Sequence, residues 1–139
     1  MSSDNAEGRP RPEARVQALG ALYAADVLRR EDVDIEGLSH RASQLAMGTW
    51  ERRSELDAMI SAAATTWRVE RMPAVDRTIL RLATFELLRG EQPRGVVISE
   101  AVAMAKQFST SRSGAYVNGV LSTIADSVGA DDGSDGTNL

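Results

Sequence analysis

The side chains of this chain best suited to bind a ligand are cations, and the first group lies near the N-terminus. Arg9, Arg11 and Arg15 occur within a few residues, and a helix would bring Arg11 and Arg15, four residues apart, to one face. Guanidinium groups bind phosphate through paired hydrogen bonds and stack on nucleobases. The segment therefore predicts a basic arm for nucleic acid, although a solvated helix start would have the same spacing.

A second group surrounds a serine-rich turn near the C-terminus. Lys106 and Arg112 flank this turn, and Tyr116 follows one helical turn later. Hydroxyls, backbone N–H groups and the helix dipole favour phosphate at such a place. An aromatic ring beside cations can stack an unpaired base. These three residues are candidate contacts for single-stranded RNA; the alternative is an ordinary loop with a core tyrosine.

Carboxylates inside apolar segments are the only other candidates for chemistry. Glu86 and Glu100 could act as an acid–base pair, but no nucleophile, metal-ligand set or phosphate loop accompanies them. The chain has no cysteine and a single histidine, His40, so neither a thiolate nor a histidine-based metal site is expected. We expect no catalysis and no cofactor. The two acids should instead accept hydrogen bonds, with Arg81 and Asn118 as candidate donors.

The net charge of −4 does not exclude nucleic acid, because the charges are unevenly distributed. Five of the 20 acidic residues lie in the tails: Asp4, Glu7, Asp131, Asp132 and Asp135. Residues 8–130 therefore hold 15 acids against 16 bases. A nearly neutral body can still carry a basic face.

The elements that must position these residues are helices. Apolar residues recur at helical spacing and not in strand-like alternation, and only 4% of residues are aromatic, so the core should be aliphatic. The apolar stripes predict six helices, within 12–27, 35–46, 56–67, 73–89, 98–108 and 111–129. The residues expected to begin or end helices are Pro12, Asp34, Ser54, Pro73, Gly90, Gly129 and either Ser111 or Ser113.

These helices cannot bury their stripes alone, so they should pack as one domain over residues 11–129. Its two subdomains would span about 11–68 and 69–129, between disordered tails at 1–10 and 130–139. No apolar run is long enough for a membrane span, and the N-terminus is unlike a secretory signal. A cytoplasmic protein is expected.

Several motifs of the chain resemble those of a known family. VDRTILRLATFELL (75–88), VVISEAVAMAKQFS (96–109) and YVNGVL (116–121) occur in order, preceded by ARVQALGALY (14–23). Together they resemble NusB, the bacterial transcription antitermination family. The middle, from about 26 to 67, matches only in helical pattern.

The resemblance implies an all-α compact bundle of six to seven helices in two three-helix-type subdomains, without catalysis. It implies binding of the single-stranded boxA element together with NusE, a small-subunit ribosomal protein, in complexes that help RNA polymerase read past terminators in rRNA operons. The residues carried over as RNA contacts are Arg11, Arg15, Lys106, Arg112 and Tyr116. Those carried over as NusE contacts are Tyr23 and Asp76.

The chain also departs from the family pattern. Pro12 and Glu13 stand where the N-terminal arm usually has cations, Arg112 replaces what is often an acid, and Tyr116 replaces a phenylalanine. A weakened arm keeps open a second reading, a helical protein-interaction module that has lost RNA recognition. A homodimer that buries the RNA surface is a further possibility. The length leaves no room for the α/β domain of a NusB-like RNA methyltransferase, which is therefore not expected.

Overall fold

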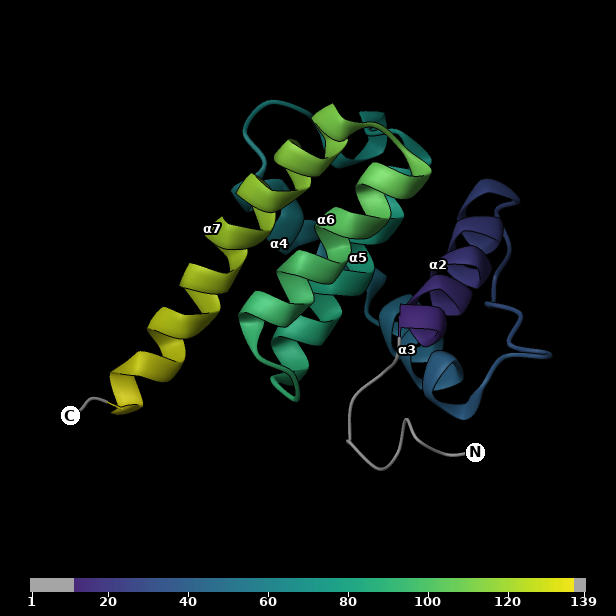
Figure 1. Cartoon of the computed structure of the whole chain (residues 1–139), viewed down its shortest axis with the longest axis horizontal. Coiled ribbons are helices and arrows are strands. Elements are labelled where there is room, and N and C mark those ends of the chain that lie inside the picture. Colours follow the sequence, from purple (N-terminus) through teal and green to yellow (C-terminus); the bar gives the residue numbers. More distant parts are fainter. Residues whose placement is uncertain (1–11, 137–139) are drawn as a thin grey trace.

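The computed structural model describes residues 12–136, with side chains from residue 13 to residue 129. This part of the chain contains six α-helices, one short 3₁₀ helix and no strand, which confirms the prediction of an all-α fold. The elements, shown in Figure 1, are α2 (Pro12–Val27), α3 (His40–Glu51), α4 (Arg53–Ala63), η1 (Val69–Arg71), α5 (Ala74–Arg89), α6 (Arg94–Phe108) and α7 (Ser111–Gly136).

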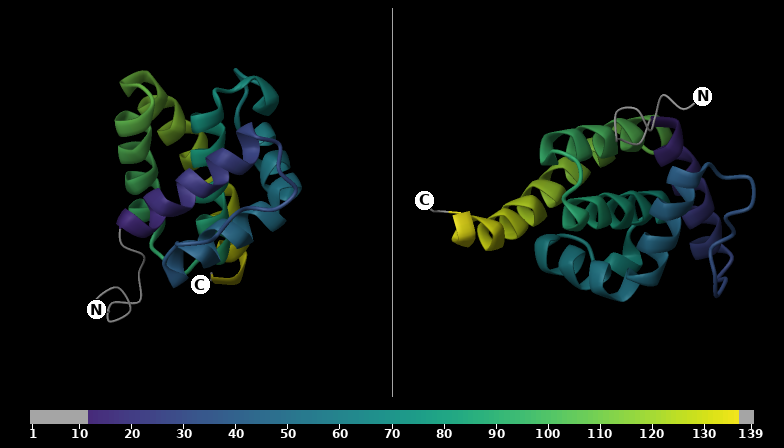
Figure 2. Two further views of the ribbon diagram at one scale, coloured as in Figure 1. Left: turned by 90° about the vertical axis from the view of Figure 1, so that its right-hand side faces the viewer. Right: turned by 90° about the horizontal axis from the view of Figure 1, so that it is seen from below.

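Helix α5 is the centre of the bundle. It contacts α2, α3, α4, α6 and α7, and Figures 1 and 2 show it between the α2–α3 pair and the α6–α7 pair. Ten of its 16 residues are buried, which is typical of a helix that is covered on most of its circumference. Each of the other five α-helices therefore packs against α5. Side chains that point toward α5 are buried, and those that point away from it face solvent.

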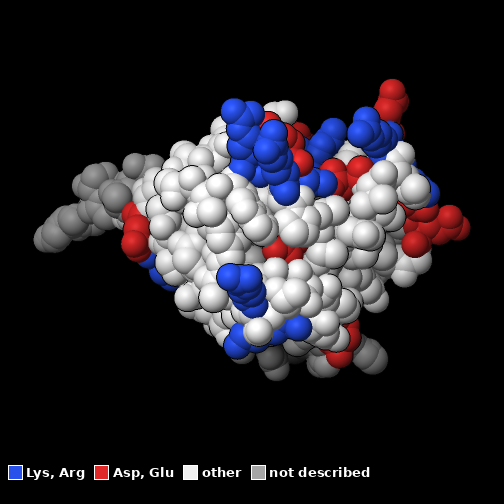
Figure 3. Space-filling model, turned by 90° about the horizontal axis from the view of Figure 1, so that it is seen from above, with Lys and Arg blue, Asp and Glu red and all other residues white. Residues whose placement is uncertain are grey.

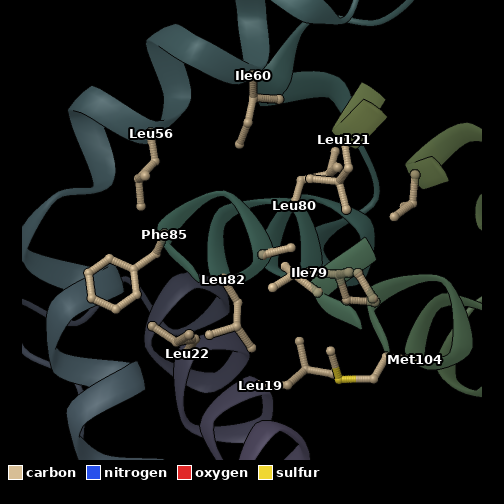
Figure 4. Close-up of a cluster of buried hydrophobic side chains, with 14 of the residues drawn as sticks. Leu19, Leu22, Leu56, Ile60, Ile79, Leu80, Leu82, Phe85, Met104 and Leu121 are labelled. Carbon is tan, nitrogen blue, oxygen red and sulfur yellow. The ribbon is translucent and has the colours of Figure 1, made fainter. Parts of the chain in front are cut away.

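The core around α5 is aliphatic, as expected from the composition. Figure 4 shows Leu19 and Leu22 of α2, Leu56 and Ile60 of α4 and Leu121 of α7 gathered around the side chains of α5. Burial of each large aliphatic side chain stabilises the fold by about 1.5–3 kcal/mol. Among the described residues, no helix combines the length and the apolar character needed to cross a membrane.

The start of α3 differs from the prediction. The Asp34 side chain does not cap a helix; it accepts a hydrogen bond from the Glu36 backbone N–H (3.0 Å) and holds a turn. Gly37 follows with φ +83°, a conformation that ends such a turn and excludes a helix. The cap is Ser39, whose hydroxyl accepts from the Ala42 N–H (3.1 Å).

The starts of α4 and α7 also differ. Helix α4 begins at Arg53 with no side-chain cap, so Ser54 lies inside the helix. Helix α7 is capped by Thr110, whose hydroxyl oxygen accepts from the Ser113 N–H (2.9 Å), and not by Ser111 or Ser113.

Three helix ends were also wrongly predicted, and the first is that of α3, which continues past residue 46 to Glu51. Helix α4 ends at Ala63, which leaves Trp67 in a loop, and α7 continues past Gly129 to Gly136. The boundaries of α5 are confirmed. Pro73 precedes its first residue, and Gly90 ends it in the left-handed conformation (φ +67°).

Candidate nucleic-acid interface

The turn between α6 and α7 presents two free cations. Lys106 and Arg112 are exposed, and within the described residues neither makes an ion pair. Gly114 makes the close packing possible, because a Cβ atom there would lie 3.0 Å from the Cγ of Lys106. The aliphatic part of Lys106 thus packs against the first turn of α7 at Gly114.

The same turn is fixed from below by a network of hydroxyls. Ser113 Oγ donates to Asp76 Oδ2 (2.7 Å) and lies 3.0 Å from Ser109 Oγ, and the Thr110 hydroxyl donates to Ser113 Oγ (3.1 Å). The network joins the α6–α7 turn to the first turn of α5, where the helix dipole favours a negative charge. It determines where the backbone of the turn lies relative to α5.

Asp76 is therefore a support and not a surface contact. Only 1% of the residue is exposed, and its Oδ1 atom has no hydrogen-bond partner. The expected direct contact of its side chain with a partner protein is not available in this fold, because Ser113 of α7 covers it. Any influence of Asp76 on binding must pass through Ser113 and the turn above it.

Tyr116 is half-buried, and its hydroxyl points into the protein without a hydrogen bond of ordinary geometry. Burial raises the pKa of this phenol; the backbone of Trp67 opposes this rise in part, and the nearby Asp76 charge adds a smaller increase. Its ring contacts the Trp67 ring, with centroids 5.5 Å apart and planes at 47°. Because 44% of Trp67 is exposed, the more accessible aromatic surface at this place belongs to Trp67.

Trp67 is the residue that the sequence analysis missed, because its spacing fitted the apolar stripe of the preceding helix. Its sequence context could have indicated an exposed position, because it follows two threonines and precedes Arg68.

Phe108, at the end of α6, is a second exposed aromatic residue at this end. Figure 3 views this end of the molecule and shows cationic side chains in separate groups, with mostly uncharged surface and a small acidic area between them. Exposed rings between cations are the combination that single-stranded nucleic acid requires.

Arg15 does not belong to this surface. Only 3% of it is exposed, and its Nε and Nη2 atoms donate to the two carboxylate oxygens of Glu86, each at 2.8 Å. The expected RNA contact by Arg15 is not available in this fold, because Arg15 shares the inward stripe of α2 with Leu19 and Leu22. Arg9 and Arg11 lie outside the described residues.

The ion pair also corrects the partner expected for Glu86, which is neither Arg81 nor Asn118. Arg81 instead donates to Asp57 (2.7 and 2.8 Å) and to Asp26 (3.3 Å).

Tyr23 remains accessible on α2, with 39% of its surface exposed. In the described part of the chain, His, Asp and Glu do not form any group of three that could hold a metal ion.

The fold and this surface define a small all-helical protein with an aromatic and basic end. The chain belongs to the NusB family, whose model matches residues 12–126. It is 40% identical over 133 residues to the transcription antitermination protein NusB of Anaeromyxobacter dehalogenans, an alignment that covers 83% of this chain and 89% of the relative. It is 42% identical over 129 residues to the protein of the same name from Chloroflexus aggregans, with 82% and 85% covered.

Solved structures agree with this assignment. NusB of T. maritima superposes with a TM-score of 0.74 at 35% identity, over 84% of this chain and 91% of that one. A structure described as antitermination factors NusB and NusE in complex with dsRNA superposes with a TM-score of 0.71 at 25% identity, over 84% and 96%. The resemblance inferred from the motifs is therefore confirmed.

Proposed function

We propose that this protein is a transcription antitermination factor that binds single-stranded RNA of the boxA type together with NusE in the cytoplasm. In this role it joins the antitermination complex of RNA polymerase and supports processive transcription of rRNA operons. Membership of the NusB family supports the proposal, and the complex of a related NusB with NusE and dsRNA supports RNA and NusE as partners. The observation that carries it is the exposed aromatic and basic end formed by the α6–α7 turn and the loop before η1.

At this end the RNA strand has two kinds of contact. Lys106 and Arg112 bind phosphates, since both are exposed and without an ion-pair partner among the described residues. Unpaired bases stack on Trp67 and Phe108, whose rings are the accessible ones. Tyr116 supports Trp67 from behind, so its ring contributes by holding the platform in place.

NusE is assigned to the exposed side of α2. Tyr23 and Val27 are four residues apart on this helix, and both are exposed, as is Leu28 directly after it. Large apolar side chains that remain in solvent at neighbouring positions are typical of a protein contact. Asp76 affects this function indirectly, by fixing the α6–α7 turn through Ser113.

The test is a salt series of filter binding with boxA-like and scrambled RNA. Arg112→Ala and Trp67→Ala should weaken binding of the boxA-like RNA, while NusE binding survives. Arg94→Ala is the matched control, because Arg94 is an exposed cation at the opposite end of α6. Equal affinity of the native protein for both RNAs, with NusE binding intact, would instead support the second function, a helical protein-interaction module.

A further inference from the structure

A groove on the side of the molecule away from α6 is lined by an unusual number of arginines. It lies between the end of α2, the helices α3 and α4, the 3₁₀ helix η1 and α5, and has a volume of about 780 Å³. Five arginines and three carboxylates line it. These arginines do not form a group in the sequence, because the turn after α2 and the helices α4 and α5 contribute them separately.

The floor of the groove is balanced in charge. Arg77 binds Asp26 through Nε (3.1 Å) and Nη2 (2.6 Å), and Arg81 binds Asp57 through two hydrogen bonds of 2.7 and 2.8 Å. The two carboxylates hold the two guanidinium groups in fixed positions across the contact between α2, α4 and α5. The charges that remain available to a ligand are therefore those of the rim, which are three arginines and one exposed carboxylate, Glu70 of η1.

The rim has three arginines with free N–H donors. Arg53 lies over the ring of Trp50, with its guanidinium carbon 3.7 Å from the ring centroid, and only Nη1 is used, in a hydrogen bond to the Trp50 carbonyl oxygen. Arg30 has one distant, exposed ion pair, with Asp34 at 3.8 Å. Arg29 has none within the described residues. A guanidinium offers five donors, so most donors of this rim are unused.

Arg29 is also the one described residue other than glycine with a positive φ (56°). It follows the end of α2, where the left-handed conformation normally selects glycine or asparagine. An arginine at this position is unfavourable for the backbone, and a residue held in such a conformation is a reason to look for function. Here the conformation places the side chain at the groove.

The groove and the aromatic end are joined along the chain by η1. Val69 and Glu70 of η1 form one wall of the groove, and Trp67, directly before η1, contacts Tyr116. A strand whose bases stack at Trp67 therefore reaches the groove after passing η1. Because Arg53 covers one face of Trp50, the rim offers phosphate donors more than a base-stacking surface or an apolar anchor for a protein.

We propose that this arginine groove is a second RNA contact, which binds the phosphates of nucleotides beyond those held at the α6–α7 end and does so without reading sequence. The inference rests on the proposed function, since it extends the path of the same strand. A guanidinium rim around a charge-balanced floor suits a chain of phosphates, which needs several donors at successive positions.

The test compares two RNAs with the native protein and with the double variant Arg29→Asn/Arg30→Gln. Asparagine tolerates the left-handed conformation, so the variant should keep the native melting temperature. One RNA contains only the boxA-like segment, and the other extends it with unstructured nucleotides at either end. The native protein should bind the extended RNA more tightly, and the variant should lose this gain. For the extended RNA, the slope of log K against log salt should be less steep for the variant than for the native protein by about 1.4. This corresponds to about 0.7 for each lost phosphate contact.

The short RNA is the internal control. Its affinity should be the same for both proteins, and failure of the native protein to bind it would contradict the proposed function itself. Native binding of the short RNA with no gain from the extension would overturn the groove alone. Tighter binding of the extended RNA than of the short RNA by the variant would also overturn the groove proposal. A loss of NusE affinity with both RNA affinities unchanged would also overturn the inference, because the groove would then be a protein contact.

Discussion

Replacing Glu86 by glutamine removes the negative charge that faces Arg15 inside the bundle. The two residues are 3% and 4% exposed and are joined by two hydrogen bonds of 2.8 Å. Each hydrogen bond to a charged group contributes about 1.5–3 kcal/mol, so the pair contributes about 3–6 kcal/mol. Breaking a buried ion pair on one side typically costs about 3–5 kcal/mol, which agrees with this sum.

Glutamine keeps one acceptor, so we expect Glu86→Gln to lower the free energy of unfolding by about 3 kcal/mol. That is a large part of the total stability of a domain, which is about 5–15 kcal/mol. Urea denaturation followed by far-ultraviolet circular dichroism measures the change, and the dependence on urea should keep its native slope. The double variant Arg15→Leu/Glu86→Leu is the control, because replacing both charges leaves none unpaired and should recover most of the loss.

A loss below about 1 kcal/mol in Glu86→Gln would refute the reasoning, since it would show that the Arg15 charge is not held in a low-dielectric interior. The double variant also tests the position of Arg15 directly. It should bind boxA-like RNA like the native protein, because Arg15 is inside the fold. A stable double variant with weakened RNA binding would show that Arg15 reaches the RNA.

Tyr116→Phe should stabilise the fold by about 1 kcal/mol, because it removes a buried hydroxyl without a partner. Because burial raises the pKa of Tyr116 in the folded state, deprotonation of this phenol favours unfolding. The free energy of unfolding should therefore be unaffected by this group below the unfolded pKa of about 10 and should fall as the pH rises from there toward the folded pKa. Denaturation at two pH values should show this fall in the native protein and less of it in the variant. Trp67→Ala should weaken RNA binding by about 1–3 kcal/mol, the effect of one stacked base. In a Trp50→Phe background Trp67 is the only tryptophan, and its fluorescence should be quenched by boxA-like RNA; unchanged emission at saturating RNA would contradict stacking there. Gly48→Ala should lower the free energy of unfolding by about 1–3 kcal/mol, because its Cβ would overlap the Phe85 ring; native stability in thermal denaturation would show that the ring moves aside freely.

Local signals in the sequence determined the helical class and some of its boundaries. The boundaries of α5 follow from Pro73 and Gly90, because the restricted φ of one and the left-handed conformation of the other act within a single turn. The same kind of local reasoning was wrong at Asp34, where a turn ending at Gly37 competed with the helix for the carboxylate. Capping residues predict boundaries only where no neighbouring turn offers them another partner.

Tertiary packing decided which of the candidate residues are available to a ligand. Arg15 and Arg112 are both arginines near the start of a helix, and nothing in their immediate sequence separates a buried one from an exposed one. Arg15 is buried because Glu86, 71 residues later in the chain, is brought opposite it by the packing of α2 on α5. Trp67 is exposed because α4 ends before it, and Tyr116 then covers only part of its ring.

The sequence by itself therefore determined the family, the helical fold and some of the residues proposed for the binding surface. Propensity, periodicity and capping are local properties, and the motifs retain them in order along the chain. The tertiary structure alone decided which charges neutralise one another and which remain free, because burial and ion pairing depend on side chains that are distant in sequence. Asp76 shows this most clearly: its place in the first turn of α5 follows from the sequence, whereas its burial beneath Ser113 follows only from the packing of α7.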